Sequence, residues 1–288
     1  MTFQTLSRPV TPRRTRRWVS AAFMTIILAG IALIVFYPIA LLIFTALKTP
    51  AELVRNTFGP PQAVSFNNII DVWVTEQLGG YLVNSLIVSS GVVIGSVILS
   101  ALGGFGFARL HFSNKRLYLT LLLLGLVIPF ETLIIPIFYM MRGLNLLSTY
   151  WAMIIPQVAL GLPFGILLVR SFTVSLPQEL FDAAELDGCN AWNRFWHVAL
   201  PLMRPALVAV AIFQAIWSWN QYLLPLVVVQ DPNIRTLPLM LGFFIGRYST
   251  DFGRLCAAAL MLFLPTLVFY ILFHRQILNA RLTGALNY

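Results

Sequence analysis

The sequence predicts an all-α polytopic membrane protein with six transmembrane helices. Only 10% of its 288 residues are charged, whereas soluble globular chains carry about 25%. Hydrophobic residues make up 59% of the chain, and its mean hydropathy is +0.83. Long uncharged runs separate the charges, and most reach or exceed the ~20 residues that an α-helix needs to cross a bilayer. These three observations exclude a soluble globular protein.

The predicted spans follow one another along nearly the whole chain. A basic N-terminal segment, 1–17, precedes the first span, 18–47. This run is about twice as long as the 7–15-residue apolar region of a cleaved signal peptide, so we expect a retained helix. A loop, 48–79, leads to a core, 80–275, that holds the other five spans. These spans are 82–108, 117–141, 150–170, 205–230 and 255–274, and a tail, 276–288, follows.

The basic residues predict how the spans are oriented. Six spans place both termini on the same side of the membrane. If that side is cytoplasmic, 13 of the 19 Lys and Arg residues lie in the cytoplasm and 6 lie outside. The positive-inside rule therefore predicts cytoplasmic termini, an extracytoplasmic loop at 48–79 and a cytoplasmic loop at 171–204. The net charge of +9 then reflects topology in a lipid bilayer, and we expect no nucleic-acid partner.

The sequence contains no recognisable catalytic or nucleotide-binding motif. A phosphate-binding loop needs Gly-Lys followed by Ser or Thr, but the two lysines, Lys48 and Lys115, follow Leu and Asn. The three histidines are isolated, without a partner at metal-ligand spacing. We therefore expect a chain that is not an enzyme, holds no metal or cofactor, and depends on an external energy source.

Polar side chains within the spans indicate a polar route between kinked helices. Glu131 is the one carboxylate inside a span, and an intramembrane acid is a candidate functional residue. It either faces the bundle as a hydrogen-bonded residue or lines a polar pathway. As a proton site it would support an alternative function, a self-contained proton-coupled secondary transporter. The candidate pathway residues are Asn84, Glu131, Gln214, Ser218 and Asn220.

The loop at 171–204 is too long for a simple helix–helix connection. Ser175 with Gln178 fits a capping box, which predicts a helix that Gly188 ends in a left-handed conformation. A second short helix is expected from the N-cap Asn190 to about Ala199. The predicted face of the first helix comprises Leu176, Leu180, Ala183, Ala184 and Asp187, and its acids are Glu179, Asp182, Glu185 and Asp187.

Two short amphipathic helices of this kind are typical of a surface that docks a soluble partner. The alternative is a helix pair lying on the lipid surface. Anionic headgroups would repel a cluster of four acids, so the composition favours docking.

The same loop carries a family resemblance. Residues 182–188 read Asp-Ala-Ala-Glu-Leu-Asp-Gly and are followed by Phe195 and Leu200-Pro201. This stretch resembles the EAA loop of ABC importer permeases, with Asp182 in place of the usual Glu. Weaker matches occur along the chain at Asn84-Ser85-Leu86, Ile128-Pro129 and Trp219-Asn220. Residues 282–285, Leu-Thr-Gly-Ala, are similar to the carbohydrate branch and its smaller permease of maltose-type transporters, whereas 286–288 depart from that branch.

The resemblance implies the type I ABC importer permease fold in a bacterial cytoplasmic (inner) membrane. This chain would form half of a pathway for a sugar or oligosaccharide, beside a second, paralogous permease. A cytoplasmic ATPase pair would bind ATP and Mg and receive the 175–201 loop, and an extracytoplasmic solute-binding protein would deliver the solute. The residues that the resemblance assigns to ATPase coupling are Glu179, Asp182, Ala183, Ala184, Asp187 and Gly188.

Overall fold

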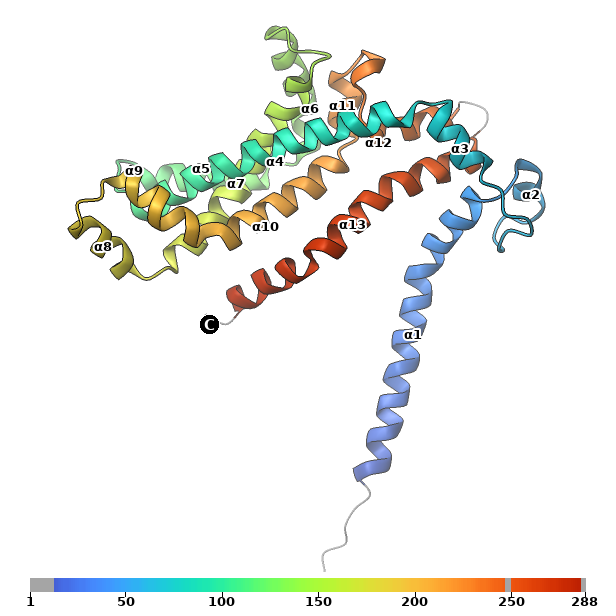
Figure 1. Ribbon diagram of the computed structural model, residues 1–288, viewed down its shortest axis with the longest axis horizontal. Coiled ribbons are helices and arrows are strands. Elements are labelled where there is room, and N and C mark those ends of the chain that lie inside the picture. The colour runs from blue at the N-terminus through green and yellow to red at the C-terminus, as the bar shows by residue number, and fades with distance from the viewer. Residues whose placement is uncertain (1–12, 247–249, 286–288) are drawn as a thin grey trace, which may run out of the picture.

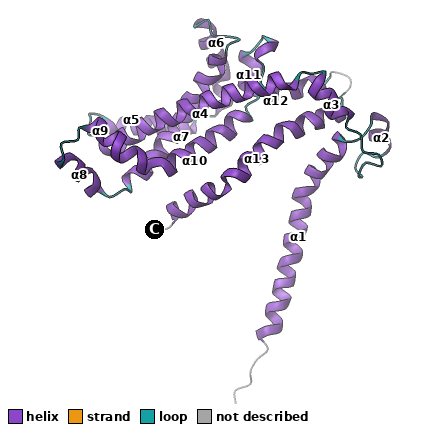
Figure 2. Cartoon of the chain, in the orientation of Figure 1, coloured by secondary structure: helices purple, strands orange, loops and turns teal. Residues whose placement is uncertain are grey.

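A computed structural model describes residues 13–246 and 250–285, with side chains over 22–246 and 250–271. Within these ranges the chain is helical, with one isolated β-bridge between Ile245 and Thr250 and no strand (Figure 2). The predicted all-α class is confirmed. Residues 1–12 of the predicted N-terminal segment and 286–288 of the predicted tail lie outside the described residues.

Five stretches of the described chain are helices long and apolar enough to cross a membrane. They comprise α1 (Arg13–Ala46), α4 (Leu78–Arg109), α7 (Tyr150–Val174), α10 (Leu200–Trp219) with the turns before it, and α13 (Phe252–Ala285). A bent pair, α5 (Lys115–Val127) and α6 (Phe130–Gly143), is the sixth candidate. The shorter helices are α2 (Pro50–Arg55), α3 (Asn67–Val74), α8 (Gln178–Leu186), α9 (Ala191–Arg194), α11 (Leu223–Val228) and α12 (Leu237–Met240).

The expected third span, 117–141, is not one continuous helix. Its halves, α5 and α6, are bent by 104° at Ile128–Pro129. Proline lacks an N–H and excludes helical geometry from the residue before it, and Ile128 is accordingly extended, at φ −73° and ψ 119°. The sequence indicated kinked helices, but a bend this large turns α6 away from the direction of α5 (Figure 1).

The expected fifth span, 205–230, is also not one continuous helix. Helix α10 ends at Trp219, and α11 begins only after Tyr222. At the end of α10 the Asn220 amide donates to the Ile216 carbonyl over 2.8 Å. Such a side-chain bond competes with the helical ladder, which explains why the helix stops within an apolar run.

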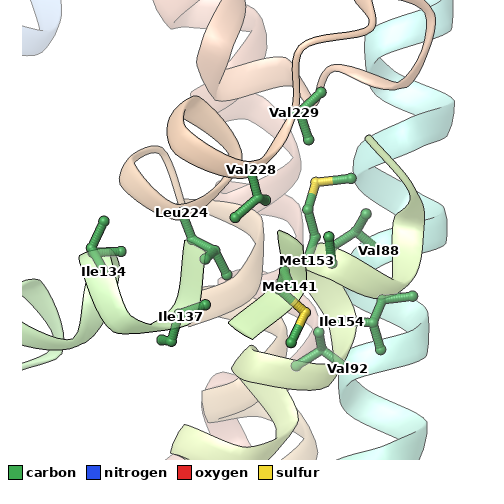
Figure 3. Packing of buried hydrophobic residues seen from close by; sticks show 11 residues of the cluster. Val88, Val92, Ile134, Ile137, Met141, Met153, Ile154, Leu224, Val228 and Val229 are labelled. Atoms are coloured by element: carbon green, nitrogen blue, oxygen red, sulfur yellow. The ribbon is translucent and has the colours of Figure 1, made fainter. Parts of the chain in front are cut away.

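Helices α4, α7 and α10 form the centre of the bundle (Figure 1). A Cβ built on Gly91 would contact Ile154, and one on Gly104 would lie 2.5 Å from Val169 Cγ1, so α4 and α7 run in the same direction. A side chain at position 104 would therefore separate the two helices. The apolar cluster between α4, α6, α7 and α11 includes Met141 and Met153, both fully buried (Figure 3).

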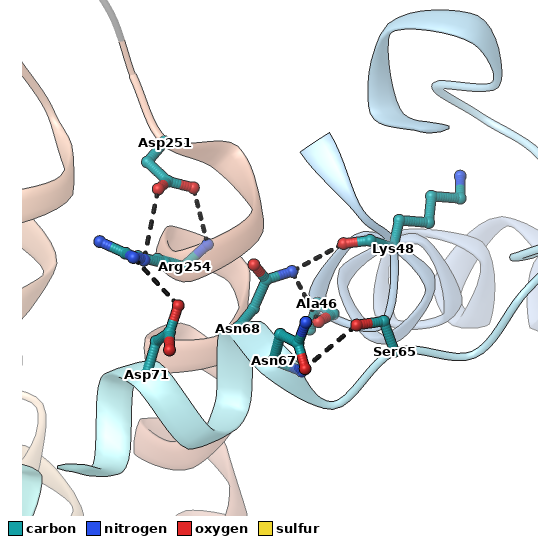
Figure 4. Close-up of polar contacts among 8 residues, drawn as sticks. All are labelled: Ala46, Lys48, Ser65, Asn67, Asn68, Asp71, Asp251 and Arg254. Atoms are coloured by element: carbon teal, nitrogen blue, oxygen red, sulfur yellow. Dashed lines mark hydrogen bonds and ion pairs between the residues drawn. The ribbon is translucent and has the colours of Figure 1, made fainter. Parts of the chain in front are cut away.

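Helix α1 extends away from this bundle and adjoins it near its C-terminal end (Figure 1). Most of its side chains from residue 22 to 38 are exposed. The Asn68 amide on α3 donates to the carbonyls of Ala46 and Lys48, over 3.0 and 2.8 Å (Figure 4). On the same helix, Asp71 accepts a 3.0 Å bond from Arg254 of α13. Helix α3 therefore joins the end of α1 to the start of α13.

Candidate docking site between α7 and α10

The chain between α7 and α10 lies at one end of the bundle and carries α8 and α9 (Figure 1). We call residues 175–199 the docking loop. Asn190 caps α9 by accepting a 2.9 Å bond from the Asn193 N–H, as predicted. The second helix does not end near Ala199, however. A π-helical turn at Phe195–Ala199 joins α9 to α10 without a break, and Pro201 lies in the first turn of α10.

The start of α8 also differs from the prediction. The Ser175 hydroxyl donates to the Phe172 carbonyl over 2.7 Å, and Ser175 is the C-cap of α7. Pro177 is the N-cap of α8, and the Gln178 amide donates to Asp182 over 2.8 Å. The expected capping box is wrong because α7 extends to Val174 and uses Ser175 to end its own last turn.

Helix α8 buries Phe181 and Ala184 against the bundle. Of the face that the sequence predicted, only Ala184 is buried, whereas Leu180 is 45% exposed. Leu186 is 90% exposed at the end of the helix. Leu180 and Leu186 are therefore both exposed beside the acidic residues of α8.

Arg109, the last residue of α4, fixes α8 to the bundle. Its guanidinium donates to the carbonyls of Thr173 and Leu176, over 2.8 and 2.7 Å, and to the Gln178 side chain. Its central carbon lies 4.1 Å from the centre of the Phe181 ring, a cation–π contact. The planar Arg109 guanidinium group therefore links the ends of α4 and α7 to the start of α8. The sequence predicted no contact between Arg109 and this loop.

A second set of contacts fixes the far end of α8. Arg194 on α9 forms an ion pair with Glu185. Phe195, 3% exposed, packs with its ring centre 5.4 Å from that of Phe105 on α4, and the Trp192 ring stacks against it. An exposed ion pair contributes at most about 1 kcal/mol, so the buried Phe195 is the stronger anchor.

Gly188 ends α8 with a φ of +82°, which confirms the predicted left-handed stop. A Cβ built on Gly188 would meet nothing within 4 Å. Glycine is therefore favoured at this position by the backbone conformation and not by a lack of space. Beside it, Asp187 is exposed, as are Glu179, Asp182 and Ala183. Within the described residues, Glu179 and Asp187 form no side-chain hydrogen bond or ion pair, so their charges remain open to a partner.

The five candidate pathway residues do not form one site. The Asn84 amide donates to the carbonyls of Asn233 and Arg235, over 2.8 and 2.9 Å, and accepts from the Tyr150 hydroxyl over 2.7 Å. It is a buried structural tie between α4 and the 231–235 segment. Glu131 is exposed in the first turn of α6.

The other three candidates lie near the end of α10. Asn220 is exposed, and Ser218 is buried with no partner for its hydroxyl among the described residues. Gln214 lines a groove between α7 and α10. Within the residues whose side chains are described, no group of three or more His, Cys, Asp or Glu could hold a metal ion.

The apolar helices of the described chain define a multi-pass membrane protein. The family model of the binding-protein-dependent transport system inner membrane component matches residues 100–282, which include α7, the docking loop and α10. The chain therefore belongs to this family, and the predicted relationship to ABC importer permeases is confirmed.

Relatives share most of the length of the chain. It is 33% identical over 268 residues to the arabinooligosaccharides transport system permease protein AraQ of Halalkalibacterium halodurans, covering 92% of this chain and 95% of that one. It is 32% identical over 264 residues to the diacetylchitobiose uptake system permease protein NgcG of Streptomyces coelicolor, covering 91% and 87%.

Solved structures share the fold at low sequence identity. A chain of a bacterial ABC transporter that imports the acidic polysaccharide alginate matches with a TM-score of 0.80 and 20% identity, over 93% of this chain and 99% of that chain. A second match, with a TM-score of 0.66 and 13% identity, is a chain of the alginate transporter in complex with an alginate pentasaccharide-bound periplasmic protein, over 91% and 96%. The predicted importer-permease fold is thus confirmed.

Proposed function

We propose that this chain is the transmembrane subunit of an ATP-driven, binding-protein-dependent importer for a sugar or oligosaccharide. The observation that carries the substrate class is the extended similarity to permeases whose names specify arabinooligosaccharides and diacetylchitobiose. The chain would form half of the pathway in a bacterial cytoplasmic membrane, beside a second, paralogous permease. An extracytoplasmic binding protein would deliver the solute at the end opposite the docking loop.

In this proposal the docking loop lies in the cytoplasm and receives a partner ATPase, which holds ATP and Mg. The excess of Lys and Arg on that side and on both termini supports this orientation. Leu186, with the acids Glu179 and Asp187, would contact the ATPase, since these side chains are exposed on α8.

The contacts of α8 indicate how movement of the ATPase would reach the membrane. Arg109 joins α8 to α4 and to the end of α7. Arg194 and Glu185 join α8 to α9, which continues into α10. A displacement of α8 would therefore move the three central helices together, and rocking of those helices would open the pathway to one side or the other.

The alternative, a self-contained proton-coupled transporter using Glu131, is not proposed. The chain belongs to a family of components of binding-protein-dependent systems. Within the described residues Glu131 forms no hydrogen bond or ion pair with a second ionisable side chain, as a proton relay would require.

The direct test is to tag the chain, extract it in mild detergent and identify the proteins that co-purify. We expect a second permease and an ATPase in fixed stoichiometry, and ATP-dependent sugar uptake after reconstitution with the binding protein. A chain that purifies alone and still transports would overturn the proposal.

A further inference from the structure

Three basic side chains gather at the docking-loop end of the bundle, where α4 ends, α5 begins and α7 nears its end (Figure 1). They are Lys115 and Arg116 of α5 and Arg170 of α7, and we call them the basic patch. Arg116 is exposed, and the other two are partly exposed. Within the described residues, none of the three forms an ion pair with an acid. The patch therefore carries uncompensated positive charge.

Contacts with the end of α4 hold two of these side chains near each other. The Lys115 ammonium donates to the Leu110 carbonyl over 3.1 Å, and Arg170 Nε donates to the Phe107 carbonyl over 3.3 Å. Both cations thus bind the C-terminal end of α4, where positive charge is favourable. The charge of Arg170 also acts on the Lys115 ammonium. Because like charges repel each other, an anion bound between them would relieve this repulsion.

Most N–H donors of the basic patch are available to such an anion. Ammonium and guanidinium groups each carry several N–H donors. In the described part of the chain, Lys115 and Arg170 each use one nitrogen for a carbonyl of α4, and the Arg116 side chain forms no hydrogen bond. Phosphate oxygens accept several charge-assisted bonds at once, and arginine donates two in parallel. The patch therefore matches the chemistry of a phosphate group.

Aromatic side chains lie beside the basic patch. The ring centres of Phe107 and Phe112 are 5.4 Å apart, and those of Phe112 and Tyr118 are 6.3 Å apart. Phe112 is 41% exposed and Tyr118 is 48% exposed. Tyrosine is enriched where a bilayer meets water, because its ring is apolar and its hydroxyl is polar. Aromatic and basic side chains together indicate the level of the lipid headgroups.

Helix α5 continues from the patch as an exposed apolar surface. None of its residues is buried, and Leu117, Leu121 and Leu124 repeat at the spacing of one helical face. Each of these three leucines is more than half exposed. Helix α5 is also one half of the bent candidate span, so in a bilayer this face meets acyl chains. A phosphate site at the head of an acyl-chain surface fits a phospholipid better than free phosphate.

We propose that the basic patch and the exposed face of α5 bind an anionic phospholipid such as phosphatidylglycerol. The phosphate of the headgroup accepts hydrogen bonds from the patch, and the acyl chains cover the leucines of α5. Basic residues at the membrane surface attract anionic headgroups, and a zwitterionic lipid lacks this net attraction. The site goes beyond the proposed function, because it does not depend on the transported solute. In the proposed orientation the lipid belongs to the cytoplasmic leaflet.

The test titrates lipids onto the purified protein in mild detergent, in whichever assembly the chain purifies. The probes are phosphatidylglycerol, phosphatidylcholine and inorganic phosphate, and native mass spectrometry and the unfolding temperature report binding. Phosphatidylglycerol should be retained and should raise the unfolding temperature with its concentration, since a ligand that binds only the folded state stabilises it. Phosphatidylcholine and inorganic phosphate should do neither at the same concentrations.

Substitutions in the basic patch test its contacts. Lys115→Gln, Arg116→Gln and Arg170→Gln should each weaken binding of phosphatidylglycerol about fivefold, the effect of losing one basic charge near a lipid surface. Lys115→Arg and Arg170→Lys keep the charge and should keep most of the affinity. If Arg170→Gln fails to assemble, Arg116→Gln still tests the site, because Arg116 is exposed and its side chain forms no hydrogen bond in the described chain.

Arg204→Gln is the matched control. Arg204 is an exposed arginine in the first turns of α10, at the same end of the bundle. Its side chain forms no hydrogen bond or ion pair within the described residues. Binding of phosphatidylglycerol should therefore stay unchanged in this variant.

Several outcomes would overturn the lipid site. Equal retention of phosphatidylglycerol and phosphatidylcholine by the wild type would do so, and so would no retention of either, as expected if another subunit covers α5. Equal losses in Arg204→Gln and the patch variants would indicate a general effect of surface charge. Inorganic phosphate that binds as tightly as phosphatidylglycerol would exclude a role for the acyl chains. None of these outcomes concerns sugar uptake, so the proposed function would stand.

Discussion

The Arg109 guanidinium carbon lies 4.1 Å from the centre of the Phe181 ring, although the two residues belong to different helices, α4 and α8, that are far apart in the sequence. The same side chain donates to the carbonyls of Thr173 and Leu176. Arg109 therefore positions the buried side of α8 while the acids and Leu186 stay exposed. These contacts attach α8 directly to the bundle.

Arg109→Lys should uncouple transport. A lysine ammonium cannot reproduce the planar fork, and charge-assisted hydrogen bonds contribute about 1.5–3 kcal/mol each. We expect ATP hydrolysis to persist while sugar uptake falls about tenfold or more. Arg204→Lys is the matched control, since Arg204 is exposed and forms no hydrogen bond or ion pair within the described residues. Equal uptake by both variants would contradict the positioning role of Arg109.

Gly188→Val should impair the coupling of ATP hydrolysis to sugar uptake, because valine strains the backbone at this position. Gly188 has a φ of +82°, where a β-branched residue costs about 1–2 kcal/mol or more. Gly188→Asn should be nearly neutral, because Asn tolerates this conformation and the space around position 188 is open. The measurement is sugar uptake per assembled complex. Equal loss in both variants would indicate that the ATPase contacts position 188 directly and not through backbone geometry.

Leu186→Ser should weaken association with the ATPase. Leu186 is 90% exposed, so the isolated chain loses little stability. Burying a leucine side chain at an interface contributes about 1.5–3 kcal/mol to the free energy of binding. Leu186→Ser should therefore weaken the affinity for the ATPase by roughly 10- to 100-fold. Titration of purified ATPase onto the permease pair measures this affinity. Leu144→Ser, at the 59% exposed C-cap position of α6, is the control and should bind like the wild type.

Gly104→Ala should destabilise the bundle, whereas Gly106→Ala should not. The new methyl at position 104 would lie 2.5 Å from Val169 Cγ1 and 3.1 Å from the Arg170 backbone nitrogen. Overpacking of this kind costs about 1–3 kcal/mol. A Cβ at position 106 would meet nothing within 4 Å, and Ala favours a helix over Gly by about 1 kcal/mol. Thermal unfolding in detergent should therefore shift in opposite directions for the two variants.

Glu131→Gln should preserve sugar uptake without making it depend on a proton gradient. Glu131 is exposed in the first turn of α6, and exposed substitutions change free energies by about 0.5 kcal/mol, or two- to threefold in rate, roughly. A protonophore should affect neither protein. Abolished uptake in Glu131→Gln, together with proton-dependent uptake in the wild type, would restore the secondary-transporter hypothesis.

The sequence by itself determined the class of the protein, the positions of the apolar segments and the site of the docking loop. These depend on local properties. A run of about 20 apolar residues must cross a bilayer wherever it lies in the chain, and Gly188 ends α8 because of its own backbone. The motif at 182–188 likewise lies within one short helix and its end.

The tertiary structure alone decided which side chains meet. Asn84, predicted to line the pathway, bonds to carbonyls 149 and 151 positions away. Arg109 binds Thr173 and Leu176, which are 64 and 67 positions away, and Gln214 packs on Gly161. The 104° bend after α5 also sets Phe130 against Trp217. Hydrophobic periodicity records which residues are apolar but not which distant helices adjoin them, so these contacts emerge only when the bundle packs.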